Sequence, residues 1–172
     1  MNEYRGTGMI AAGWGVAGVA LLLGSAIYRL TPLAVEALTS ELLWYHWLVL
    51  LVVLLFMAYV EGYQAFQQGF SPRVAARARY LIAHRNLLHA LFAPLFCMAY
   101  FHAPRRRRIT AISVTAGIVV LVMLVRYVPQ PWRGIVDAGV IVGLAWGLIS
   151  LLILTVQAFV SDRFDYSPEV PE

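Results

Sequence analysis

The sequence predicts an all-α protein, a polytopic transmembrane helical bundle, from its composition and from the length of its apolar blocks. The chain has 172 residues, of which 61% are hydrophobic and 13% are charged, and its mean hydropathy is +0.74. A soluble domain carries about 25% charged residues and could not bury this surplus of apolar side chains. Several apolar blocks reach the ~20 residues that cross a bilayer. We therefore expect a multi-pass membrane protein with five hydrophobic helices.

The first two hydrophobic segments cover about residues 9–30 and 42–60, and a short linker with Pro32 joins them. Trp44 and Trp47 stand at the start of the second segment, as in the aromatic belts of membrane interfaces. Small residues recur at helical spacing along the first segment, and such a face lets another helix backbone approach closely. They are Gly13, Ala17, Ala20 and Gly24.

The third hydrophobic segment, residues 87–103, is short, contains Pro94 and follows a basic amphipathic helix expected at about 72–85. Ser71 and Pro72 predict the start of that basic helix, as N-cap and first helical residue. If the third segment crosses, the arginines divide almost evenly between the two sides of the membrane. If it is re-entrant, turning at Pro94, most arginines share one side, as cytoplasmic loops prefer. We expect five crossings, because an unbroken apolar run of this length more often crosses, and keep the re-entrant segment as the alternative.

The fourth and fifth segments cover residues 109–128 and about 132–160. Gly139, Gly143 and Gly147 form a glycine ladder in the fifth segment, a second close-packing face. We expect residues 1–160 to form a single transmembrane domain and the acidic tail, 161–172, to be disordered. The C-terminus is expected in the cytoplasm with either topology, and the membrane is expected to be a bacterial inner (plasma) membrane.

Polar residues beside the apolar helices are the candidates for function, because ionisable groups are costly to keep in a membrane. Five crossings would bring seven of them to one membrane face, where Arg133 could pair with Asp137 at i,i+4 spacing. We expect these groups to lie near helix ends in the head-group layer. The alternative is a small proton-linked carrier or channel that uses Glu61 and Asp137. The candidate cluster is Glu61, Gln64, Arg85, Asn86, His89, Arg133 and Asp137.

A membrane redox protein that binds haem is a second alternative, because the chain has four histidines. On a continuous third helix, His89 and His102 would point about 140° apart. The ligand pairs that remain are His84 with His89 and His46 with His102. We expect no cofactor and no metal site, because metal motifs are absent from the sequence and Cys97 is its one cysteine. Catalytic motifs are absent too, so we do not expect an enzyme.

Four consecutive arginines precede the fourth segment: Arg105, Arg106, Arg107 and Arg108. They are expected to fix a helix end at the cytoplasmic face and to bind anionic lipid head groups, at ~1 kcal/mol for each arginine. Nucleic acid is not an expected partner, because no basic run is interleaved with aromatic residues. The two small-residue faces favour a non-enzymatic membrane subunit that packs as a homo-oligomer or against a partner membrane protein.

Overall fold

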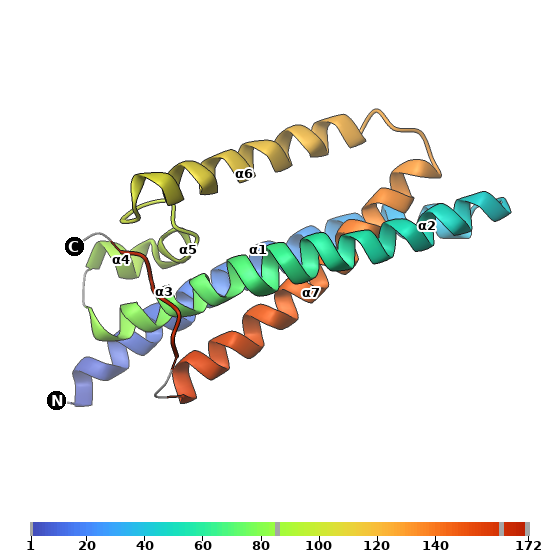
Figure 1. Cartoon of the computed structure of the whole chain (residues 1–172). Coiled ribbons are helices and arrows are strands. Elements are labelled where there is room, and N and C mark those ends of the chain that lie inside the picture. Colours follow the sequence, from blue (N-terminus) through green and yellow to red (C-terminus); the bar gives the residue numbers. More distant parts are fainter. Residues whose placement is uncertain (1, 85–86, 162–163, 171–172) are drawn as a thin grey trace.

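The structure, a computed structural model, describes residues 2–84, 87–161 and 164–170, and every regular element in these ranges is a helix. Three long helical rods lie side by side, and one long helix stands apart from them (Figure 1). The expected all-α bundle of long apolar helices is confirmed. The described helices that are long and apolar enough to cross a membrane number four: Gly8–Thr39, Trp44–Ala83, Arg105–Val125 and Trp132–Val160.

The first helix, α1 (Asn2–Thr39), continues through Pro32, where the sequence predicts a linker. Proline cannot donate to the carbonyl one turn back. The neighbouring Thr31 hydroxyl donates to Ile27 O at 2.8 Å, and Gln130 Nε2 donates to Leu33 O at 3.3 Å. Membrane helices tolerate proline where neighbouring groups satisfy the backbone in this way, because lipid offers no other partners.

The second rod consists of α2 (Trp44–Met57), a wider π-type stretch η1 (Ala58–Phe70) and α3 (Ser71–Ala83). The helix expected after Ser71 forms, but it continues the rod and has no start of its own. Ser71 has helical dihedrals and is buried, and its hydroxyl donates to Gly147 O at 3.4 Å. Ser71 therefore binds another helix, where the sequence predicted a cap.

The third hydrophobic segment does not form a long helix. It forms two short helices, α4 (Leu87–Leu91) and α5 (Ala93–Cys97), separated by Phe92 in a non-helical conformation. Beyond α5 the chain turns, with Ala99 in the left-handed region at φ 64°. The end of α3 and the start of the next long helix consequently lie at the same end of the bundle (Figure 1). Five full crossings are therefore not observed, and the segment turns back, as in the alternative topology.

Close contact with α1 explains why this segment folds back. A Cβ at Gly15 would lie 2.8 Å from Cys97 Sγ and 3.3 Å from Ala93 Cβ, so the missing side chain lets α5 lie directly on α1. Gly18 faces the Pro94 ring in the same way. Pro94 also stands at the start of α5, where a missing N–H costs no helical hydrogen bond.

The last two long helices are α6 (Arg105–Val125) and α7 (Trp132–Val160). None of the 21 residues of α6 is buried, and α6 stands apart from the rods in Figure 1. Helix α7 lies between α1 and the second rod and contributes to both apolar clusters. The larger cluster joins α1, α3, α5 and α7, and the smaller one joins α1, α2 and α7 near Ile135. Both described chain ends lie at the end of the bundle that holds α4 and α5 (Figure 1).

Candidate functional site

Glu61 lies deep in a membrane-spanning rod, whereas the sequence predicted a position near a helix end. Along the helix it is about 21 Å from Trp47 in the aromatic belt and about 18 Å from Arg73. The reason for the difference is that the rod continues through η1 and α3, so the polar residues after Glu61 remain helical. A carboxylate at this depth is costly, which makes it the leading candidate for function.

The Glu61 carboxylate faces a glycine of the neighbouring helix. A Cβ at Gly143 would lie 2.5 Å from Glu61 Oε2 and 2.8 Å from its Cδ, so the glycine makes room for the carboxyl group. Oε2 is buried and has no hydrogen-bond partner among the described residues. The carboxylate therefore points into its own bundle, between η1 and α7.

Asp137 lies apart from Glu61, about 9 Å further along α7 from Gly143 toward Trp132. It is 4% exposed, and its Oδ2 is 3.8 Å from Arg133 Nε, so the expected i,i+4 ion pair forms at long range. Neither of these two atoms has a hydrogen-bond partner in the described part of the chain. The single cavity expected to join Glu61 and Asp137 is not assembled.

The other members of the predicted polar cluster are dispersed. Gln64 is exposed one turn beyond Glu61. His89 lies with α4 at the end of the bundle, because the third segment folds back there. Arg85 and Asn86 lie outside the described residues. The sequence analysis missed Gln67, whose Oε1 accepts a 2.7 Å hydrogen bond from Trp146 Nε1, so this polar contact joins η1 to α7 one to two turns from Glu61.

The glycine ladder of α7 is used inside the bundle. A Cβ at Gly139 would lie 3.0 Å from Met57 Cγ, and one at Gly147 would lie 2.5 Å from Phe66 Cγ. Together with the contact at Gly143, these close approaches let α7 lie against α2 and η1 along most of its length. The ladder is therefore a contact within one chain.

The small-residue face of α1 is open. No described atom outside its own helix lies within 4 Å of a Cβ placed at Gly13 or Gly24. Ala17 is exposed and Ala20 is half-buried. The glycines that α1 uses within the chain lie on a different face, with Gly15 against α5 as described above. One of the two predicted packing faces is therefore occupied and the other is free.

Arg77 of α3, which the sequence placed on an exposed basic face, is 1% exposed. Its Nε donates to Phe96 O at 2.6 Å, and its Nη2 donates to Phe101 O at 3.0 Å and His102 O at 2.9 Å. The guanidinium carbon lies 4.2 Å from the centre of the Phe96 ring. Arg77 thus satisfies carbonyls of the turn after α5, and its apolar neighbours Val74 and Ala78 were the sequence signal for this burial.

Arg77 also holds the C-terminal tail, which the sequence predicted to be disordered. Its Nη1 donates to Pro168 O at 2.9 Å, and Arg107 of α6 forms a 2.5 Å ion pair with Glu169. The described tail residues, 164–170, therefore lie against α3. The remaining arginines of the predicted lipid site, Arg105, Arg106 and Arg108, are exposed.

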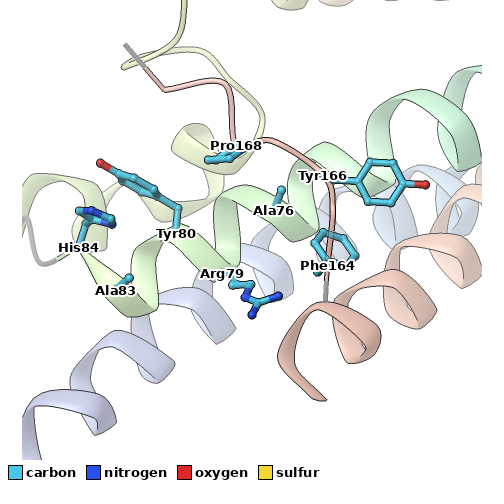
Figure 2. A pocket seen from close by; sticks show the side chains of 8 residues that line it. All are labelled: Ala76, Arg79, Tyr80, Ala83, His84, Phe164, Tyr166 and Pro168. Carbon is cyan, nitrogen blue, oxygen red and sulfur yellow. The ribbon is translucent and has the colours of Figure 1, made fainter. Parts of the chain in front are cut away.

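A shallow pocket of about 180 Å³ lies between α3 and this tail (Figure 2). Ligand pockets usually have about 300–1,000 Å³, so this one is small for a substrate. Most of its lining is apolar or aromatic: Ala76, Arg79, Tyr80, Ala83, His84, Phe164, Tyr166 and Pro168. We assign no activity to it.

The folded-back segment brings together two histidines that a continuous helix would separate. The rings of His89 and His102 are 4.6 Å apart, whereas His84 stacks on Tyr80 at 4.0 Å. His46 accepts the Leu43 N–H at the start of α2. Neither expected histidine pair has a ring contact among the described residues, and these residues contain no group of three metal-ligating side chains. Burial, with smaller effects of His102 and Arg77, lowers the pKa of His89.

A comparison with protein-family models finds no match for this chain, and comparisons with curated proteins and with solved structures find none either. The class of protein therefore follows from the chain itself. It is a helical bundle whose four long apolar helices are typical, in length and composition, of a multi-pass membrane protein.

Proposed function

We propose that this chain is a non-enzymatic membrane subunit that works by packing against other transmembrane helices, either in a homo-oligomer or as an accessory subunit of a larger complex. The observation that carries the proposal is the contrast between α7, which is packed on several sides, and α6, which has no buried residue. A spanning helix without protein contacts is surrounded by lipid or by a second protein.

The open face of α1 supports the same proposal. Membrane helices associate through close backbone approach at small residues, because apolar side chains gain little by leaving lipid. Gly13 and Gly24 leave such a groove uncovered, while other glycines of α1 are filled from within the chain. All copies of a membrane protein insert in one orientation, so the α1 helices of neighbouring copies run parallel and can meet along this groove.

The distribution of arginine supports a cytoplasmic location of both chain ends in a bacterial inner membrane. Arg29, Arg126 and Arg133 lie toward the end of the bundle with Trp44 and Trp132. The other described arginines lie toward the end with the two chain ends, where α4 and α5 are. The cytoplasmic side carries the excess of basic residues, and anionic lipids there would bind the exposed arginines at the start of α6.

The test is the native mass of the full chain in mild detergent and in lipid nanodiscs. We expect a mass above that of one chain, or a partner that copurifies. The double variant Gly13→Leu and Gly24→Leu should reduce the mass without unfolding the protein, because nothing within the chain contacts these positions. Leu21→Ala, on another exposed face of α1, is the matched control. A monomer without any partner in both environments would contradict the proposal.

A further inference from the structure

We propose that Glu61 is a proton-binding site in the interior of the membrane, which exchanges its proton with the side that holds the two chain ends. The inference concerns a different part of the molecule from the open face of α1 and does not depend on oligomerisation. It rests on the depth of Glu61, on the burial of Oε2 against α7, and on the distribution of polar residues along the second rod.

The surroundings of the carboxyl group provide no counter-charge. Helix α7 carries two charged residues, Arg133 and Asp137, and both lie about 9 Å or more along the helix from Gly143. These two residues pair with each other. On α1, the other helix packed on α7, Arg29 and Glu36 are both exposed.

The titratable groups nearest to Glu61 on its own rod do not face it either. Tyr59 and Tyr63 stand two residues to either side, so they point away from the Gly143 contact, and their rings stack on each other at 5.9 Å. Beyond them, Arg73 and His46 lie about 18 Å and 22 Å along the helix. An ionised carboxylate without a buried partner is strongly disfavoured, whereas a neutral carboxyl group is tolerated. Glu61 in the contact with Gly143 is therefore the protonated form.

Polar side chains connect this site to one end of the bundle. Toward Trp44, residues 48–60 are apolar except for Tyr59. In the other direction Gln64, Gln67 and Gln68 follow, and then Arg73. Gln64 and Gln68 are exposed, so water can reach the helix surface on this side. The proton then reaches Glu61 from the end with the two chain termini.

Proton release has a structural consequence. Loss of the proton breaks the O–H bond and leaves a carboxylate, which must gain water or a cation. The contact with Gly143 has no room for either, because even a Cβ there would lie 2.5 Å from Oε2. Ionisation therefore requires η1 to move relative to α7. The wide helical turns of η1 suit such a movement, since π-type turns occur frequently at functional sites.

The test is infrared spectroscopy of the full chain in lipid nanodiscs, titrated from about pH 5 to about pH 10. We expect a protonated-carboxyl band that disappears on titration, is absent in Glu61→Gln, and is retained in Glu36→Gln, the matched control on exposed α1 surface. Glu61→Asp keeps a titrating carboxyl group, with a shifted band, and serves if Glu61→Gln does not fold.

A second measurement is labelling with a hydrophobic carbodiimide, which reacts with protonated carboxyl groups in membranes. Labelling of Glu61 should fall about tenfold for each pH unit above the midpoint of the titration. Two outcomes would overturn the proposal. A carboxylate that stays ionised throughout would mean that a cation from a partner pairs with it. A band that never titrates would mean a permanently neutral side chain.

Discussion

Helices α6 and α7 are neighbours in the sequence and similar in hydropathy, yet they differ completely in their protein contacts. Their most apolar windows have mean hydropathies of 2.2 and 2.4, but 0% of the first and 39% of the second is buried within the bundle. The difference lies in the glycines of α7, which meet Met57, Glu61 and Phe66 of the second rod. Hydropathy thus decides that a helix crosses a membrane, and small residues decide against what it packs.

The largest effect that would test this comparison is expected at Gly134 of α7. A Cβ there would lie 2.6 Å from the backbone oxygen of Leu33, which cannot move without displacing α1. Gly134→Leu should lower the free energy of unfolding by about 3 kcal/mol, the upper range for overpacked sites. The measurement is denaturation of the protein in detergent.

The matched control is Gly117→Leu in α6, where a Cβ meets no described atom within 4 Å. We expect a change within about 0.5 kcal/mol for the isolated chain. Equal destabilisation by the two variants would show that α6 packs within the chain as closely as α7 does.

A smaller effect is expected from a pair of leucines. Leu151 of α7 is 0% exposed, whereas Leu121 of α6 is 51% exposed. Leu151→Ala should cost about 2 kcal/mol, the low end for buried leucines, because lipid rather than water solvates the helices before they associate. Leu121→Ala should change stability little in the monomer. If Leu121→Ala instead lowers the native mass, α6 is the helix that contacts a neighbouring chain.

The smallest effect concerns the segment between the two rods and α6. Since the pKa of His89 in the folded chain is lowered from its usual 6.5, the unfolded chain binds the proton more readily. Stability from this group is present above about pH 6.5 and falls as the pH drops through that value. The melting temperature should therefore decrease from pH 7 to pH 5, and less so in His89→Phe. A variant that melts like the parent at both pH values would rule out this role for His89.

The sequence was sufficient for the transmembrane class and for the positions of the long apolar helices. It also indicated the Arg133–Asp137 spacing and the close-packing role of Gly139, Gly143 and Gly147. These predictions depend on neighbours within a few turns of one helix, where composition and periodicity carry the information. They fail where a helix end was inferred from polarity, as at Glu61 and Ser71, because interactions with α7 keep the rod helical.

What the sequence by itself determined is therefore that this chain crosses a membrane, since burial in lipid depends on the apolar length of each segment alone. The tertiary structure decided that the third segment folds back, that Arg77 is buried, and that Glu61 lies in the membrane interior. The physical reason is that each of these depends on groups distant in the sequence. Gly15 leaves the space for α5, the carbonyls of Phe96 and Pro168 satisfy Arg77, and Gly143 makes room for the Glu61 carboxyl group.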